Sequence, residues 1–527
     1  MPRRAAGVLA AAASLAAAAS LAPSTDAIAS PAAISGKAGG PVGPGVEKVA
    51  SGTVRSLGEP AAAQDAAATA VAATTFGTAG AQAAVWTRRV GSAVWRRSGS
   101  VLPAGFGSSY DPAAAAVPGG PLLVVAGTAP PGEQCITSGS VAIASVGSRG
   151  TLGTARLVSD QRGTGSFDDR PIVAVGQHGT AWVAWSQGPD ADACQDVGRA
   201  DRIEVAVSHD AGMTFGAPVA MPGDGGHSAF GVRLAPLPGG QAAVSWTETT
   251  ATGGQAVLVS VLGADGRPRQ PEPVLTGDGP PLVLPGATFY DFPAGDIAAL
   301  PDGKLMVAAP FWVSGRSVIK LAAGTPGGPW QQTSLNPPAG ADLLLPALGL
   351  LSPGEVRLLC AVHTRSGDRL GYHWASITLT SRGAAVSLAG LRELTPAPPG
   401  PGFFEIGEEL ALARTHDGLL TAVVVAGQDG AALETATFSS PAAATTPPDN
   451  TGTPASRTPS PGTPGTSGRT AAGAGTAKAA NARPRGFATT AAWLAAAALA
   501  CAGAAGAVLL RRRRGSARHH RPSHRRR

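Results

Sequence analysis

The chain has 527 residues, of which 44% are hydrophobic and only 14% charged, with 72 Gly and 46 Pro. This length is sufficient for one large folded core plus tails. The formal net charge of +7 does not indicate nucleic-acid binding, because residues 511–527 alone carry nine Arg and the rest of the chain is slightly acidic.

The N-terminal segment has the features of a secretory signal. Arg3 and Arg4 precede an uncharged apolar stretch, residues 5–21, and Ala27 and Ala29 form a small-x-small cleavage site. Residues 1–29 are therefore predicted to be a signal peptide, with a retained membrane anchor as the alternative. Residues 30–82 are rich in Ala, Gly, Pro and Ser without sustained periodicity, and we expect a mostly disordered linker there.

A strand–turn–strand pattern recurs six times between Asp111 and Ala426. Each turn ends in glycine and is followed by a second apolar run; the glycines are Gly120, Gly179, Gly240, Gly303, Gly354 and Gly418. The intervals of 51 to 64 residues leave room for four short strands, the size of one blade of a β-propeller. The sequence thus predicts an all-β, six-bladed propeller of four-stranded blades over residues 83–440.

The second repeat shows the expected blade most clearly. Its strands A to D are predicted at 171–175, 180–185, 203–207 and 217–221. The turn between the last two fits the Asp-box, S-x-D-x-G-x-T-[WF], with Ser208, Asp210, Gly212, Thr214 and Phe215. Asp210 can accept hydrogen bonds from turn N–H groups, and Gly212 can adopt a positive φ. Degraded versions lie at the same hairpin of other repeats, at 145–150, 260–266, 325–330 and 376–383.

This motif resembles the Asp-box (BNR-repeat) propellers, the superfamily that includes sialidases. The resemblance implies the propeller fold and places the Asp-box, as a structural turn, on the face opposite the catalytic pocket. Sialidase catalysis needs three Arg, a Tyr nucleophile paired with Glu, and an Asp acid/base. The Arg-Ile-Pro motif of the family is absent, and Arg170-Pro171 is its closest remnant, so no catalytic residue is assigned. The weak catalytic candidates are Tyr290, Arg170, Arg233 and Glu405.

The loops that lead into the innermost strands should surround an axial funnel. Carboxylates, two Arg and aromatic rings in such a funnel suit a sugar or a cationic ligand. The alternative is that these are ordinary strand-start and turn residues, where Asp is common. The ligand-binding candidates are Tyr110, Asp111, Asp168, Asp169, Arg170, His227, Arg233, Tyr290, Asp291, Phe404 and Glu405.

The last repeat supplies only part of a blade before the chain changes composition. Residues 419–426 and 432–438 give two of its strands, and the fourth strand is missing. We expect part of residues 83–101, namely 92–98, to complete this blade and remove an open sheet edge. A loose N-terminal hairpin is the alternative.

Cys135 and Cys194 fall in equivalent loops of adjacent repeats. In an oxidising compartment they are expected to form a disulfide, with two free thiols as the alternative. Cys360 lies in an apolar run and is expected to be a buried thiol. Three nearby carboxylates could bind calcium, but they lack the Gly and the terminal Glu of established loops: Asp190, Asp192 and Asp196. We therefore predict no metal site and no cofactor.

The C-terminal region predicts a membrane anchor. Residues 441–485 form a Pro/Thr/Ser-rich stalk, 486–510 an apolar transmembrane helix, and 511–527 a basic cytoplasmic tail. The whole predicts a single-pass protein that displays its propeller outside the cell. Its expected function is a ligand- or partner-binding module at the bacterial surface, for a glycan or a protein and not a nucleic acid. The alternatives are a sialidase-like exo-glycosidase acting on glycans and a spacer without a defined ligand.

Overall fold

The structure is a computed structural model that describes most of the chain between Val46 and Ser439. The gaps in this range are 53–56, 78–79, 133–137, 190–201, 224–227, 250–253, 282, 288–293, 380–385, 389–390, 396–409, 416–417 and 428–429. None of the helical segments in these ranges is long and apolar enough to cross a membrane. The predicted signal peptide, stalk, transmembrane helix and basic tail all lie outside the described residues.

The described residues form seven antiparallel sheets, so the predicted propeller is confirmed and the predicted count of six blades is wrong. The first blade contains β2 (Leu57–Gln64), β3 (Ala68–Gly77), β4 (Gly80–Arg89) and β5 (Arg96–Ser100). The second contains β6 (Ser108–Ala116), β7 (Leu122–Ala129), β8 (Ser140–Val146) and β9 (Arg156–Leu157). The third contains β10 (Ser166–Val175), β11 (Ala181–Pro189), β12 (Arg202–Ser208) and β13 (Val219–Ala220).

The remaining blades follow the same order. The fourth contains β14 (Ala229–Leu237), β15 (Gln241–Thr249), β16 (Gln255–Leu262) and β17 (Glu272–Gly277), with the 3-10 turn Pro238–Gly240 between its first two strands. The fifth contains β18 (Asp296–Ala299), β19 (Leu305–Val313), β20 (Arg316–Gly324) and β21 (Trp330–Leu335). The sixth contains β22 (Ala341–Ser352), β23 (Glu355–Thr364), β24 (Arg369–Leu379), β25 (Val386–Leu388) and β26 (Arg392–Thr395). The seventh contains β27 (Ala411–Arg414), β28 (Gly418–Gly427), β29 (Gly430–Ser439) and β1 (Val46–Gly52).

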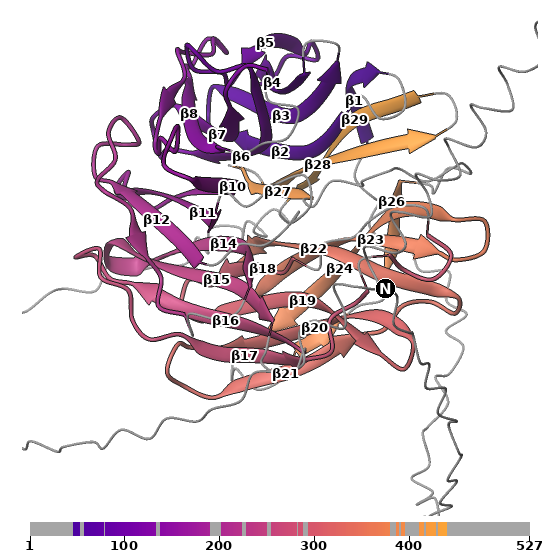
Figure 1. Ribbon diagram of the computed structural model, residues 1–527. Coiled ribbons are helices and arrows are strands. Elements are labelled where there is room, and N and C mark those ends of the chain that lie inside the picture. Colours follow the sequence, from indigo (N-terminus) through magenta and orange to yellow (C-terminus); the bar gives the residue numbers. More distant parts are fainter. Residues whose placement is uncertain are drawn as a thin grey trace, which may run out of the picture. The chain divides into compact units, whose positions relative to one another are not determined.

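In each of the first six blades, the strand that comes first in the sequence is the innermost. In the seventh blade, the innermost strand is β27. These strands contact one another in the order β2, β6, β10, β14, β18, β22 and β27, and β27 returns to β2. The sheets therefore surround a central axis in a closed ring, with the N-terminal and C-terminal strands side by side (Figure 1). Closure leaves no central sheet without a neighbour to bury its apolar surface.

The blade beyond the six predicted is the first in the chain. Its strands occupy part of the predicted linker 30–82 and of the segment 83–101, so both assignments are corrected. The turn between β2 and β3 contains no glycine. Asp65 closes it instead, since its Oδ1 accepts hydrogen bonds from the N–H groups of Ala67 (2.7 Å) and Ala68 (2.6 Å). The buried apolar residues of this blade's strands are mostly alanine, which packs between close sheets but gives a weak hydrophobic signal.

The ring is closed by β1, which pairs antiparallel with β29, with Val46 opposite Ala436. An N-terminal strand thus completes the last blade, as expected, but the strand is Val46–Gly52 and not 92–98. Residues 92–98 instead belong to the hairpin and β5 of the first blade. Residues 92–98 were assigned to the last blade because the first blade was not recognised, so the segment just before Asp111 was taken to be the closing strand.

The strand order gives the ring two distinct faces. The innermost strands begin at one face, which also carries the turns between each second and third strand; we call it the mouth face. The opposite face carries the turns between the first and second and between the third and fourth strands; we call it the turn face. The core lies between adjacent sheets, where Trp182, Trp185 and Trp246 are fully or nearly fully buried.

Candidate functional site

Five of the seven innermost strands are interrupted by a bulge near the mouth face. Their pairing with the second strand shifts register at 58/61, 110/113, 169/172, 230/233 and 344/347. One residue in each bulge has a positive φ: Glu59 (50°), Asp111 (47°), Arg170 (52°), Gly231 (65°) and Leu345 (48°). Bulges re-aim side chains, and non-glycine residues at positive φ cluster at functional sites. The first three blades in this way place a charged side chain at equivalent positions around the axis.

Glu59 and Asp111 form a carboxyl pair across the seam between the first two blades. Glu59 Oε2 accepts hydrogen bonds from the backbone N–H of Asp111 (3.0 Å) and from the Thr74 hydroxyl. Only 8% of Glu59 is exposed. Burial, the charge of Glu59 and the charge of Asp169 together raise the pKa of Asp111 well above its usual range, and a hydrogen bond between the two carboxyl groups adds to this effect. Asp111 therefore keeps its proton at pH values where an isolated Asp would be ionised.

Arg170 provides the positive charge at this position in the third blade. Its Nε lies 3.7 Å from Asp169 Oδ2, and both side chains are largely buried. Arg170 lowers the pKa of Asp111 but does not offset the burial and the two carboxylates that raise it. The cluster of Glu59, Asp111, Asp169 and Arg170, which we call the mouth cluster, thus contains three acids and one base.

Asp168 lies beside the mouth cluster and is fully buried. It accepts hydrogen bonds from the Ser159 hydroxyl (2.5 Å) and from Gln187 Nε2 (2.7 Å). Burial raises its pKa, and the hydrogen bonds from Ser159, Gln187 and Gln161 reduce that rise. Its carboxyl group therefore joins loops to the blade, and it is not available to a ligand.

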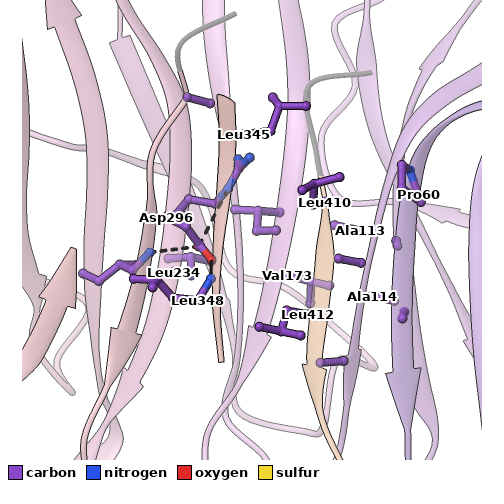
Figure 2. Close-up of a pocket in the computed structure, with 18 of the residues that line it drawn as sticks. Pro60, Ala113, Ala114, Val173, Leu234, Asp296, Leu345, Leu348, Leu410 and Leu412 are labelled. Carbon is purple, nitrogen blue, oxygen red and sulfur yellow. Dashed lines mark hydrogen bonds and ion pairs between the residues drawn. The ribbon is translucent and has the colours of Figure 1, made fainter. Parts of the chain in front are cut away.

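A cavity of about 200 Å³ lies on the axis and is lined by all seven innermost strands or their leading residues. Figure 2 shows Asp296 at one side of this axial cavity and Pro60, Ala113 and Ala114 at the other. Pro60 directly follows Glu59, so the cavity begins where the mouth cluster ends.

The polar wall of the axial cavity is formed by Asp296 and Arg233. Asp296 Oδ2 accepts a hydrogen bond from the N–H of Leu348 (2.6 Å), and Arg233 Nε lies 4.0 Å from Asp296 Oδ1. Burial raises the pKa of Asp296, while Arg233 and the backbone N–H groups oppose this. The other lining residues have apolar side chains, so Asp296 and Arg233 are the charged groups of this wall, and backbone polar groups contribute the rest of its polar surface.

The structure brings together some of the predicted ligand residues and not others. Asp111, Asp169 and Arg170 share the mouth cluster, and Arg233 lines the axial cavity. Tyr110 is buried against Gly127, whose position leaves no space for a side chain, and it supports the blade. The other candidates lie outside the described residues: His227, Tyr290, Asp291, Phe404 and Glu405.

Glu59 was missed because it fell in the predicted linker. A signal was nevertheless present in the sequence. Glu59-Pro60, Asp111-Pro112 and Arg170-Pro171 each place a charged residue before proline in an apolar strand, at intervals close to one blade. Proline restricts the residue before it and cannot donate to the sheet, so a bulge is the natural place for this dipeptide.

The Asp-box turn lies on the turn face, away from the mouth cluster. Asp210 Oδ1 accepts from the Thr214 N–H (2.8 Å), and Asp210 Oδ2 accepts from the Thr214 hydroxyl (2.6 Å). Ser208 Oγ accepts from the Gly212 N–H (2.9 Å). The hydrogen bonds from the Thr214 hydroxyl and N–H, with one from the Ser208 hydroxyl to Asp210 Oδ1 (2.7 Å), hold the pKa of Asp210 well below its usual range. Phe215 packs against the core between the second and third blades.

Cys135, Cys194 and the acidic loop 190–196 lie outside the described residues, so the disulfide stays a prediction. Within the described ranges, Cys360 is a buried free thiol, and burial raises its pKa to about 12. The same ranges contain no group of three or more His, Cys, Asp or Glu that could hold a metal ion.

No known protein-family model matches the chain, and no curated protein matches it. Solved structures of similar fold include a PL25 ulvan lyase (11% identity, TM-score 0.47, covering 73% of this chain and 94% of that one). They also include an α-L-arabinanase of Penicillium chrysogenum (12%, 0.41, 76% and 99%) and the NanB sialidase of Streptococcus pneumoniae (10%, 0.40, 59% and 66%). The described part of the chain is an all-β propeller with seven blades, a fold that fits the sialidase-like superfamily suggested by the Asp-box. These likenesses do not assign an activity to it.

Proposed function

We propose that this protein is a surface-displayed propeller that binds a neutral or amine-bearing glycan at the mouth cluster, above the axial cavity. The observation that carries the proposal is the recurrence of one strained bulge in the first three blades. It holds Glu59, Asp111 and Arg170 around the axis at the same height. Strained backbone positions cluster at ligand-binding and active sites. Carboxylates in such a site accept hydrogen bonds from the hydroxyl and amine groups of a sugar.

The charge of the mouth cluster favours this ligand class over an anionic sugar. Arg170 is already paired with Asp169, and Arg233 with Asp296. A ligand carboxylate would have to displace these partners and would approach the negative charge shared by Glu59 and Asp111. Like-charge contacts of this kind oppose binding.

Hydrolysis is the second candidate function, because a carboxyl group with a raised pKa is a potential general acid. The geometry of the pair opposes a standard glycosidase role for it. Glycosidase carboxyl groups are about 5 Å or more apart so that they flank the scissile bond. Glu59 and Asp111 are in direct hydrogen-bond contact, and a sugar could not fit between them without separating the pair.

The export and anchoring of the propeller are part of the same proposal. They are supported by the signal-like residues 1–29 and by the apolar segment 486–510 with its basic flank. Fractionation of cells that express the full chain, with protease added outside, tests this part: the propeller should be cleaved in intact cells.

The binding proposal is tested with a glycan array that contains neutral, amino and sialylated sugars, probed with the propeller. We expect neutral or amino sugars to be retained, and we expect Glu59→Gln together with Asp111→Asn to weaken retention at least tenfold. Arg267→Ser, on the turn face, is the matched control and should bind as the wild type does. Preferential retention of sialylated sugars would overturn the proposed ligand class. Turnover of a fluorogenic sialoside by the wild type would overturn the proposal in favour of hydrolysis.

A further inference from the structure

One hairpin of the first blade carries an exposed surface that the mouth cluster does not use. The turn between β4 and β5 exposes Arg89, Val90 and Val94, and the first residues of β5 add Arg96 and Arg97. Val90 is 48% exposed and Val94 58% exposed, which is high for an aliphatic residue in a folded domain. No acidic residue occurs between residues 88 and 100.

The neighbouring blade extends this surface. Thr87 Oγ1 and Ser98 Oγ both donate hydrogen bonds to the carbonyl oxygen of Gly150, at 2.8 and 2.9 Å. The exposed Arg149 precedes that glycine, so its turn is fixed against the hairpin. We call this surface the basic hairpin patch; it consists of Arg89, Val90, Val94, Arg96, Arg97 and Arg149.

The hairpin is held in a defined conformation. The Val90 N–H donates to the Ala67 carbonyl (2.9 Å), and the Ser92 N–H donates to the Arg89 carbonyl (2.9 Å). The Arg88 guanidinium stacks on Trp95, with 4.6 Å to the ring centroid, and forms an ion pair with Glu47. Arg88 is thus neutralised within the fold, and the four other Arg supply the outward positive charge.

The basic hairpin patch lies next to the point where the chain leaves the propeller. β4 and β29 are the third strands of adjacent blades, so both end at the turn face. Glu47, the partner of Arg88, pairs in the sheet with Thr435 of β29, which ends at Ser439. The sequence after Ser439 leads, through residues 440–485, to the apolar segment 486–510. Residues 440–485 tether this point to the apolar segment, so the patch stays close to the surface that would hold the predicted anchor.

We infer that the basic hairpin patch docks the turn face onto an anionic lipid surface. Arg side chains near such a surface strengthen attachment about fivefold each, and the exposed Val90 and Val94 add to it by entering the interface. This inference rests on the proposed function only in placing the propeller beside a membrane. The arrangement directs the mouth face away from the bilayer, toward ligands in the surroundings.

Vesicle co-sedimentation tests the inference. All strands that close the ring lie between Val46 and Ser439, so the propeller without its predicted anchor can be used, with its melting temperature measured for every variant. We expect binding to vesicles that contain phosphatidylglycerol, weaker binding to pure phosphatidylcholine, and release by 0.5 M salt. The triple variant Arg89→Ser, Arg96→Ser, Arg97→Ser should lose at least tenfold in binding. Val90→Ser with Val94→Ser should also weaken it, whereas the control Arg267→Ser with Arg316→Ser should not.

The inference is overturned if the wild type shows no preference for phosphatidylglycerol, or if the triple Arg variant binds as the wild type does. It is also overturned if soluble polyglutamate binds equally well and the two Val substitutions have no effect, because a polyanionic partner and not a lipid surface would then fit the patch. Glu59→Gln together with Asp111→Asn separates the two proposals: it should weaken glycan retention at least tenfold and leave vesicle binding unchanged. If the wild type binds vesicles as expected but no glycan, only the proposed function is overturned.

Discussion

Glu59 Oε2 accepts a hydrogen bond from the backbone N–H of Asp111, 3.0 Å away across the seam between the first and second blades. Both residues occupy the same bulge of their strands and both have a positive φ. The contact therefore fixes two strained segments against each other and brings two carboxyl groups to the axis. Such strain costs on the order of 1–3 kcal/mol for each residue and persists only when the surrounding structure enforces it.

The carboxyl pair should make stability depend on pH in a defined direction. The pKa of Asp111 is raised above its usual 3.8, so the folded state keeps a proton that the unfolded state releases. The stability contributed by this group is complete below pH 3.8 and is lost as the pH rises through the folded-state pKa. Asp111→Asn cannot ionise, so its unfolding free energy should rise relative to that of the wild type over this window. Urea unfolding of both proteins at stepped pH measures the difference; a difference that is constant with pH would contradict the assignment.

The seam between the fifth and sixth blades predicts the opposite pH dependence. Burial alone would raise the pKa of Asp342, but hydrogen bonds from Arg365 and the Ser317 N–H, together with the nearby His363 ring, hold it well below its usual range. Its contribution is present above pH 3.8 and is lost as the pH falls through the folded-state pKa. At pH 7 we expect Asp342→Asn to cost about 2–3 kcal/mol. The exposed control Asp302→Asn should cost less than about 0.5 kcal/mol, and an equal effect of the two variants would refute this role.

Gly212 tests the Asp-box turn as a structural element. Its φ is 79°, and a Cβ there would lie 2.6 Å from Leu123 Cδ1 in the adjacent blade. Gly212→Ala should therefore destabilise the propeller by about 2–3 kcal/mol, from backbone strain plus overpacking. Gly163 has a similar φ of 74° but open space around it, so Gly163→Ala should cost only about 1 kcal/mol. Chemical denaturation compares the two, and equal costs would show that the contact with Leu123 contributes nothing.

Ring closure by β1 gives a prediction about truncation. A chain that begins at Val46 retains every strand of the ring, whereas a chain that begins at residue 53 leaves β29 as an open edge. The longer chain should melt as the full propeller does. The shorter one should lose roughly 5 °C or more and should self-associate through the exposed edge. Calorimetry and size-exclusion chromatography provide the measurements, and a monomeric, unshifted shorter chain would show that closure does not depend on β1.

The sequence allowed the propeller to be predicted, because turn glycines such as Gly179 and Gly303 adopt positive φ between apolar strands and recur at blade intervals. It did not allow the blade count to be predicted, because Asp65 replaces that glycine in the first blade. The mouth cluster was predicted in part, since Asp111, Asp169 and Arg170 precede recognisable strands. Glu59 was not placed beside them, because it belongs to the blade that no turn glycine marked.

The most direct test of the account is a crystal structure of the propeller with a glycan selected from the array. We predict a ligand above the axial cavity that contacts Glu59, Asp111 or Arg170 directly. A ligand bound to the outer strands or to the turn face, with the mouth cluster unoccupied, would contradict it.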